Sequence, residues 1–381
     1  MQSFDFQLRP RIVFGMGVIE QLGTLAVELG SRSVLLVSDP GVVSAGHFDT
    51  GKRSLEAAGI RVHAFHGFGE NPTTAHVDAG VEVARQTKPD LLVGLGGGSS
   101  MDCAKGINFV YSCGGSVKDY WGVGKATADM LPMIAVPTTA GTGSEAQSFA
   151  LISDAQTHVK MACGDPRAAC AVALLDPALT VTQPHAVTAL TGVDALSHAV
   201  ETYVTVRRNA MSSTFSRQSF GLIASNLAKV LKTGDDLEAR SAMQVGACLA
   251  GMAIETSMLG AAHATANPLT AHFGITHGQA VGLMLPHIIR FNGTAHARWY
   301  AELLSEIEPG HTDSATAPNR LAEIVTDLVA QAGLKTSLTD LGVDTSILDT
   351  LASDASKQWT GTFNPIPVDE NNLLEIYQQA V

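Results

Sequence analysis

One carboxylate and three imidazoles in the second half of the chain have the residue types and spacing of a metal site. Asp194 and His198 are four residues apart in the string ALTGVDALSHAVETYV. On a helix this spacing places both side chains on one face, about one turn apart. His263 and His277 follow in GAAHATANPLTAHFGITHG, fourteen residues apart, as if from one helix and the loop or helix after it. This donor set suits a divalent transition metal such as Fe(II) or Zn(II).

Residue types alone leave another interpretation of these histidines open. A lone histidine on a helix is more often a structural residue with satisfied hydrogen bonds than a metal ligand. His272 and His287 lie nearby and are rival ligands on spacing alone. The Asp-xxx-His pair favours the metal interpretation, because it joins two ligand types on one helical face.

The glycine-rich string GLGGGSSMDCAK, residues 94–105, has the character of a phosphate-binding turn. It follows an expected strand and should open a helix, with Ser99 or Ser100 as the cap and Asp102 in the first turn. Three glycines would let the backbone approach a phosphate at the positive helix end; they are Gly96, Gly97 and Gly98. Ser99 stands where the fingerprint GxGxxG has its last glycine, so a plain Rossmann label does not apply. A tight strand–helix turn without a ligand is the alternative.

Two further segments could serve a nucleotide. Asp39 ends the strand-like string LLVSD, where a carboxylate can bind ribose hydroxyls and repel a 2′-phosphate, which favours NAD over NADP. Asp before Pro-Gly is also a common turn residue, and taken alone that interpretation prevails. The loop PTTAGTGSE, residues 137–145, offers the hydroxyls of Thr138, Thr139 and Thr142.

The composition is that of a compact protein with room for two domains. The chain has 381 residues, of which 45% are hydrophobic and 16% charged. Its net charge of −12 argues against nucleic acid or an anionic membrane as the main partner, though backbone dipoles can still bind an anionic cofactor. Five cysteines without a CxxC pair disfavour a disulfide framework and a cysteine zinc site. With no signal-peptide region and no uncharged apolar run of membrane-spanning length, we expect a cytoplasmic protein.

Strand-like and helix-like strings alternate in the first half of the chain. Near-continuous apolar strings suit a parallel sheet buried on both faces; they occupy 33–39, 90–96, 131–139 and 170–177. Helical strings lie between them, as at 48–59 and 74–87. From Pro184 onward, apolar residues recur at spacings of three and four without a clear strand. We therefore expect a doubly wound α/β nucleotide-binding domain over residues 1–183 and an all-helical domain over residues 184–381.

Together, the ordered motifs resemble the iron-containing (group III) alcohol dehydrogenase family. The matching strings span nearly the whole chain; in order they are RIVFGMG, VSDPG, GGGSSMDCAK, PTTAGTGSE, LLDPALT, GVDALSHAVETYV, HATANPLTAHFGITHG and FNPIPVDENNLLEIYQQA. The resemblance implies an N-terminal NAD-binding domain with a Rossmann-like parallel sheet and an all-α C-terminal domain, a dehydroquinate synthase-like architecture. It also implies a homodimer.

The resemblance assigns roles to individual residues by motif position. The implied metal ligands, which would act in catalysis through the metal, are Asp194, His198, His263 and His277, with iron favoured over zinc. The implied cofactor contacts are Gly97, Gly98, Ser99, Thr138, Thr139, Thr142, Lys160 and Leu179, with Gly96 in the same glycine turn. Asp39 matches the position linked to NAD preference.

One position departs from the family pattern. Many members carry histidine four residues after the third ligand, in HGMAHPLG or a similar string, and that histidine is thought to help relay protons. Here the string is HATANPLT, so the position is Asn267. Asparagine hydrogen-bonds but cannot carry a proton at neutral pH, so His272 or water would have to replace the relay.

The implied activity is hydride transfer between NAD and a small primary alcohol or diol, with a divalent metal polarising the substrate oxygen. Alternatives are a hydroxyacid–oxoacid transhydrogenase and a metal-free reductase of the maleylacetate type, the latter disfavoured by the intact ligand set. An NAD-using lyase of the dehydroquinate-synthase type would need a basic pocket, which the strings around the ligands lack. A non-catalytic nucleotide-binding paralogue, with Asn267 as a sign of decay, is disfavoured by the four retained ligands.

Overall fold

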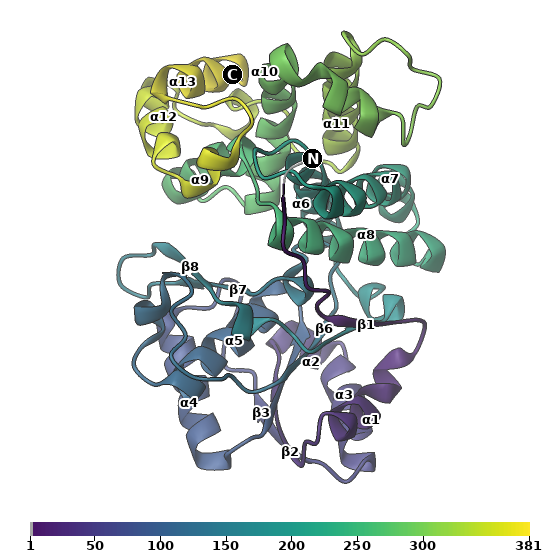
Figure 1. Ribbon diagram of the computed structural model, residues 1–381, viewed down its shortest axis with the longest axis vertical. Helices are drawn as coiled ribbons and strands as arrows, with labels where there is room; N and C mark the ends of the chain where they lie inside the picture. The colour runs from purple at the N-terminus through teal and green to yellow at the C-terminus, as the bar shows by residue number, and fades with distance from the viewer. Residues whose placement is uncertain (1–2) are drawn as a thin grey trace. The chain divides into compact units, whose positions relative to one another are not determined.

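The computed structural model describes residues 3–381, which form two compact units (Figure 1). One unit holds Gln7–Thr139 and Gly143–Gln183 and contains every strand of the described residues. The other unit holds Pro184–Val381, together with Ala140–Thr142 and the N-terminal stretch that ends at Phe6. Its regular elements are all helices, so the change of sequence texture near Pro184 marks a change of architecture.

The first unit is built on a six-stranded sheet in the order β1-β9-β6-β4-β2-β3, with every pairing parallel. The strands are β1 (Arg11–Phe14), β2 (Ser33–Val37), β3 (Arg61–Phe65), β4 (Leu91–Gly96), β6 (Met133–Pro137) and β9 (Val172–Leu175). The four apolar strings of the sequence are the fully buried strands β2, β4, β6 and β9, as predicted. The edge strands β1 and β3 are more exposed, and their sequences are correspondingly less apolar.

Helices cover both faces of this sheet. They are α1 (Leu22–Glu28), α2 (Pro40–Ser44), α3 (His47–Ala57), α4 (Thr74–Thr87) and α5 (Gly98–Cys113). Successive residues of β2 point to opposite faces. Leu36 packs in a cluster with side chains of α1 and α3, whereas Leu35 packs in a separate cluster with side chains of α4 and α5. The predicted doubly wound α/β layout is therefore confirmed.

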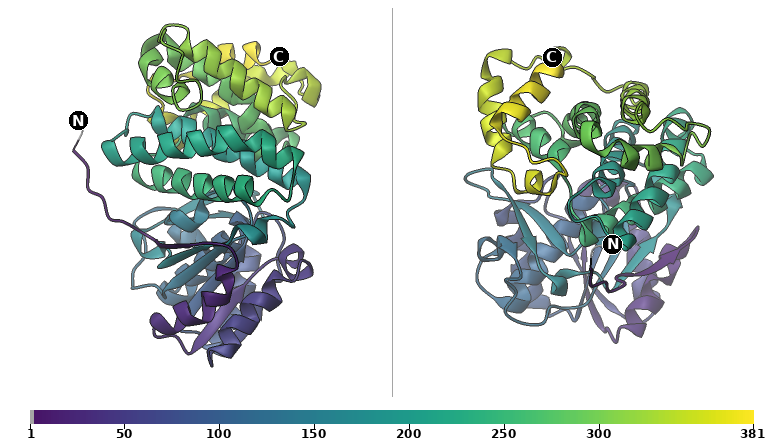
Figure 2. Two further views of the ribbon diagram at one scale, coloured as in Figure 1. Left: turned by 90° about the vertical axis from the view of Figure 1, so that its right-hand side faces the viewer. Right: turned by 45° about the horizontal axis from the view of Figure 1, so that its top comes forward.

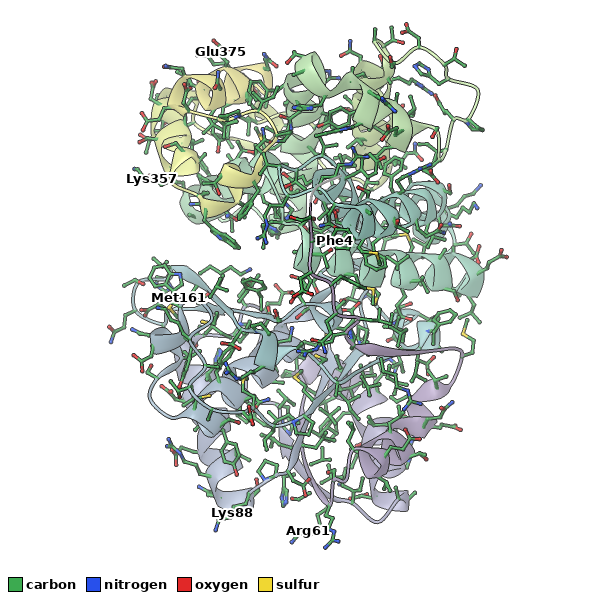
Figure 3. The ribbon with its side chains drawn as sticks, in the orientation of Figure 1. Phe4, Arg61, Lys88, Met161, Lys357 and Glu375 are labelled. Carbon is green, nitrogen blue, oxygen red and sulfur yellow. The ribbon has the colours of Figure 1, made fainter. Side chains whose placement is uncertain are left out.

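A second sheet in the same unit was not predicted from the sequence. It has three strands in the order β5-β8-β7, with β8 parallel to β5 and antiparallel to β7. The strands are β5 (Gly122–Val123), β7 (Phe149–Ser153) and β8 (Lys160–Gly164). Their positions are not uniformly buried, so none forms the continuous apolar string that marked the larger sheet. Lys160 opens β8, next to the buried Met161 (Figure 3).

The second unit is a helical assembly around one large hydrophobic cluster (Figure 2). Its α-helices are α6 (His185–Tyr203), α7 (Ala210–Lys232), α8 (Leu237–Thr256), α9 (Ala261–Phe273), α10 (His277–Leu304), α11 (Ala317–Gln331), α12 (Leu348–Ser356) and α13 (Glu370–Gln379). Helix α6 packs against α7, α8 and α10 and is buried along most of its length. A polar side chain on α6 therefore lies inside protein and needs a partner there.

Among residues 3–381, no single helix combines the length and the apolarity needed to cross a membrane. Helices α8 and α9 meet the criterion only as a pair, which bends by 103° at its break.

Candidate metal centre and nucleotide-binding loops

Three helices of the second unit bring the four predicted metal ligands together. Asp194 and His198 lie one turn apart on the buried helix α6, as their spacing predicted. His263 is in the first turn of α9, and His277 is the first residue of α10. Consecutive helices thus supply the last two ligands, also as the spacing predicted.

The three imidazoles converge on one carboxylate oxygen. Oδ1 of Asp194 lies 3.3 Å from Nε2 of His198 and 3.7 Å from Nε2 of both His263 and His277. Asp194, His263 and His277 each offer a ligand atom within 4.8 Å of the others. The His263 ring is 5.0 Å from that of His198 and 5.1 Å from that of His277. Three ring nitrogens thus surround one carboxylate oxygen, with His198 outside the set whose ligand atoms all lie within 4.8 Å of one another.

Burial and hydrogen bonding indicate that this arrangement fits a metal ion. The side chains of Asp194, His198 and His263 are nearly inaccessible, whereas that of His277 is 35% exposed and leaves one open side. Among the described residues, no hydrogen bond of acceptable geometry satisfies Asp194 Oδ1 or His263 Nε2. Leaving buried polar atoms unpaired is costly. A divalent cation bound by these donors would satisfy both atoms.

The electrostatics of the cluster favour the binding of a cation. Burial alone would raise the pKa of Asp194, but His198 and the other two imidazoles outweigh burial and hold that pKa well below its usual range. Burial lowers the pKa of His198. For His263, burial acts in the same direction, but Glu201 and Asp194 outweigh it and raise the pKa to about 9. A cation must therefore compete with a proton at His263.

Glu201 is a member of this cluster that the sequence reasoning missed. Its carboxylate accepts a very short hydrogen bond from Nδ1 of His263 and a 2.7 Å hydrogen bond from the backbone N–H of Ala262. A signal was present in the sequence, because Glu201 follows Asp194 by seven residues and His198 by three. These spacings place all three side chains on one helical face.

The two rival histidines, His272 and His287, contact other residues. His272 pairs with Asp354 near the surface, at 2.9 Å between Nε2 and Oδ2. His287 lines a cavity of about 220 Å³ together with Arg290, and burial followed by Arg290 lowers its pKa to about 4. Neither joins the group of ligand atoms around Asp194 among the described residues.

Asn267, at the altered relay position, lies one turn after His263 on α9. Its Nδ2 donates a 3.0 Å hydrogen bond to Oε1 of Gln358. Both partners are amides, and neither carries a proton at neutral pH.

The glycine turn of the first unit differs in detail from the prediction. Helix α5 begins at Gly98 with Gly97 as its N-cap, and no side chain caps it, so the prediction that Ser99 or Ser100 caps the helix is wrong. Ser99 Oγ instead accepts a hydrogen bond from the backbone N–H of Asn71. Asp102 lies beyond the first turn and accepts a hydrogen bond from the Ser144 hydroxyl. The helix starts earlier than expected because glycines can enter it directly from the strand.

This turn retains the features that suit an anion. Gly96 has φ +149°, and a Cβ there would lie 2.3 Å from Ser100 Oγ, so only glycine fits. Without a side-chain cap, the N-terminus of the sixteen-residue helix α5 presents its positive dipole end to a ligand.

Asp39 has the structural role of a turn residue that was considered for it. Its Oδ1 caps α2 by accepting hydrogen bonds from the backbone N–H groups of Gly41 and Val42. Its Oδ2 accepts a 3.0 Å hydrogen bond from the Ser100 hydroxyl. The carboxylate thus starts a turn, as the alternative interpretation held, while joining the end of β2 to the glycine turn.

The remaining predicted cofactor positions lie on separate segments. Thr138 and Thr139 follow β6, whereas Thr142 belongs to the short stretch Ala140–Thr142 that is part of the helical unit. Lys160 is exposed, and its Nζ is 3.4 Å from Asn71 Oδ1. Leu179 is buried in a short 3-10 helix, Pro177–Thr180.

Comparison with known proteins finds the same family in both halves of the chain. A family model described as iron-containing alcohol dehydrogenase matches residues 9–177, and one described as the C-terminal part of the Fe-containing alcohol dehydrogenase family matches residues 188–381. Alcohol dehydrogenase 4 of Schizosaccharomyces pombe is 34% identical over 97% of this chain and 87% of its own length. The NAD-dependent methanol dehydrogenase of Bacillus methanolicus is 33% identical over 99% of this chain and 100% of its own length. A crystal structure of 1,3-propanediol oxidoreductase matches with a TM-score of 0.95 at 33% identity, covering 100% of both chains.

The chain therefore belongs to the iron-containing alcohol dehydrogenase family, as its motifs indicated. It is an oxidoreductase of the alcohol dehydrogenase class. Membership implies NAD and a divalent metal as cofactors, and the cluster around Asp194 offers donors for the metal.

Proposed function

We propose that this protein interconverts small primary alcohols or diols and their aldehydes, using NAD(H) and a divalent metal ion. The observation that carries the proposal is the convergence of three imidazole Nε2 atoms on Oδ1 of Asp194. The relatives named for methanol and for 1,3-propanediol support a short alcohol or diol as the substrate.

The proposed metal site consists of side chains from the helical unit, residues 184–381. Its ligands are Asp194, His198, His263 and His277. A bound divalent cation supplies Lewis-acid activation of the substrate oxygen, and NAD supplies the hydride acceptor or donor. The chain keeps Asp194 ionised and shields three of the ligands from water. We propose Fe(II) as the native ion on the strength of the family description, since the donor set accepts Zn(II) as well.

The proposed NAD site draws its residues from the sequence range 1–183; all of them lie in the α/β unit except Thr142, which belongs to the stretch Ala140–Thr142. The glycine turn and the N-terminus of α5 suit the pyrophosphate. The proposal assigns discrimination against a 2′-phosphate to Asp39, the N-cap of α2 two residues after β2. The other proposed contacts are Gly96, Gly97, Gly98, Ser99, Thr138, Thr139, Thr142, Lys160 and Leu179.

Asn267 bears on how the substrate proton leaves. Its hydrogen bond to Gln358 joins two amides, so that pair cannot relay a proton. His272 is engaged with Asp354 near the surface. We therefore propose that water carries the proton in this protein.

We further propose a homodimer in the cytoplasm. Strand β1 is an edge strand with exposed apolar side chains, Ile12 at 40% and Phe14 at 47%. An open apolar edge favours pairing with a second copy. None of the five cysteines forms a disulfide within residues 3–381, which suits a reducing compartment.

The test is NADH formation from a panel of short alcohols and diols, with chelator-stripped protein reloaded with Fe(II), with Zn(II) or with no metal. The proposal expects turnover only after metal is restored. Turnover by metal-free protein would indicate the metal-free reductase reaction and overturn the metal assignment. NADH binding without turnover on any alcohol would favour a non-catalytic nucleotide-binding protein.

A further inference from the structure

Glu201 is a buried carboxylate with no lysine or arginine as its partner among residues 3–381. It lies on α6 and is only 4% exposed. Its one ion pair is with His263, and no lysine or arginine in the described chain forms one with it. A buried carboxylate is costly unless it is paired and hydrogen-bonded, so a specific role is expected.

The Glu201 carboxylate fixes the tautomer of the His263 ring. Oε2 of Glu201 lies against Nδ1 of His263, and an ionised carboxylate can only accept a hydrogen bond. Nδ1 must therefore carry the proton of this contact. In the neutral imidazole, Nε2 is then the lone-pair donor, and it faces Oδ1 of Asp194 at 3.7 Å.

The same carboxylate also holds the helix that carries His263. Gly260, the N-cap of α9, provides no side-chain cap. Instead, Oε1 of Glu201 accepts from the N–H of Ala262 at 2.7 Å, while Oδ1 of Asn364 accepts from that of Ala261 at 3.4 Å. A Cβ at Gly260 would lie 3.1 Å from Oε1 of Glu201, so the helix end and the carboxylate are closely packed.

The charge of the cluster gives an independent argument. Once a metal ion has displaced the proton of His263 and the imidazoles are neutral, Asp194 and Glu201 contribute a charge of −2 in a buried region. A divalent cation balances that charge in full. Removal of Glu201's charge would take away one of these two negative charges.

We propose that Glu201 is a positioning residue of the metal centre, which sets the His263 tautomer, anchors α9 and supplies the second negative charge for a divalent ion. This inference rests on the proposed metal-dependent function. Residues that orient a metal-bound histidine typically contribute about 10–100-fold to metal affinity. The corresponding loss is expected for Glu201→Gln, which keeps the shape and removes the charge.

The experiment measures metal affinity by competition with a chelator and the visible absorption of the Co(II)-loaded protein, both without substrate. Glu201→Gln should bind Co(II) about 10–100-fold more weakly and show an altered ligand-field spectrum. Glu302→Gln is the matched control, because Glu302 is a carboxylate of the same helical unit that pairs with Tyr203 and Arg208 instead. Its affinity and spectrum should match those of the unaltered protein.

Wild-type affinity and spectrum in Glu201→Gln would overturn the proposal, even if that variant melts at a lower temperature, because Glu201 would then only cap α9. If Glu201→Gln does not fold, Glu201→Asp decides: it keeps the charge but is one methylene too short to hold both partners. Weaker Co(II) binding in Glu201→Asp supports the proposal, and unchanged binding contradicts it. Failure of the proposed function would give a different result. The unaltered protein would then bind no metal through Asp194, so Asp194→Ala and the unaltered protein would have the same metal affinity.

Discussion

At the scale of single residues, the metal centre depends on the chemistry of a few buried side chains. Asp194 is the common point of three imidazoles, and no hydrogen bond of acceptable geometry satisfies its Oδ1 in the described chain. The low pKa of Asp194 follows from the imidazoles, which outweigh the effect of burial. Replacing this carboxylate therefore removes both a ligand and the charge that the site is built around.

Asp194→Ala should lose its metal and its activity while the helices remain. We expect activity to fall by more than about 100-fold, since losing a residue that only orients a metal ligand costs roughly 10–100-fold. Metal content by elemental analysis and NADH formation are the measurements. Asp354→Ala, which removes a near-surface partner of His272, is the control and should retain both. Near wild-type turnover in Asp194→Ala would contradict the metal assignment.

Asp39 can be tested without loss of its structural role. Asn is as good an N-cap as Asp, so Asp39→Asn should preserve the cap on α2 while removing the negative charge. If this charge repels the 2′-phosphate, the ratio of kcat/KM for NADP to that for NAD should rise by about tenfold or more, a change of roughly 1.4 kcal/mol. Asp39→Gly should shift the ratio in the same direction. An unchanged ratio in both variants would show that Asp39 does not read the ribose.

At the scale of elements, the short segment Ala140–Thr142 is packed tightly against the helix that carries two ligands. A Cβ on Gly141 would lie 2.4 Å from Cβ and 2.8 Å from the backbone oxygen of Thr191 on α6. The backbone of Gly141 also interacts with His198, where it partly offsets the effect of burial on the pKa. This segment of the string PTTAGTGSE thus contacts α6, although its sequence indicated only a role in nucleotide binding.

Gly141→Ala should disturb α6 and, with it, the metal ligands. An added methyl in a close-packed position costs about 1–3 kcal/mol, so the thermal midpoint should fall and metal affinity should weaken. Gly310→Ala is the control, because a Cβ there meets no atom within 4 Å. Equal melting temperatures and equal metal affinities for the two variants would show that this contact has no role in the site.

At the scale of the whole molecule, we propose that the open edge of the larger sheet governs association. Strand β1 pairs only with β9, and its other side is free within the described chain. Its exposed side chains are the apolar Ile12 and Phe14 and the charged Arg11, which pairs with Glu28. The two exposed apolar side chains on an open edge favour pairing with a second copy.

Charging this edge should dissociate the proposed dimer. Ile12→Lys combined with Phe14→Lys should reduce the mass measured by light scattering from about that of two chains to that of one. Val27→Lys is the control, because Val27 is an exposed apolar residue of α1, 51% accessible, and is not on the edge strand. A monomeric unaltered protein, or a dimer that survives both charges, would contradict the assignment of this edge.

Local sequence by itself determined the residue types of the metal centre and the order of α/β and helical architecture. Four consecutive apolar strings became buried parallel strands, because burial on both faces leaves a local signature. Asp194 and His198 share a face because helical periodicity is local as well.

Tertiary structure decided what depends on contacts between distant residues. Glu201 meets His263 across 62 positions, and Ser100 meets Asp39 across 61, which no local pattern encodes. The glycine turn enters α5 without a serine cap because those hydroxyls are taken by Asn71 and Asp39. Such pairings follow from packing of whole elements, and only the folded chain brings the second buried carboxylate to the third metal ligand.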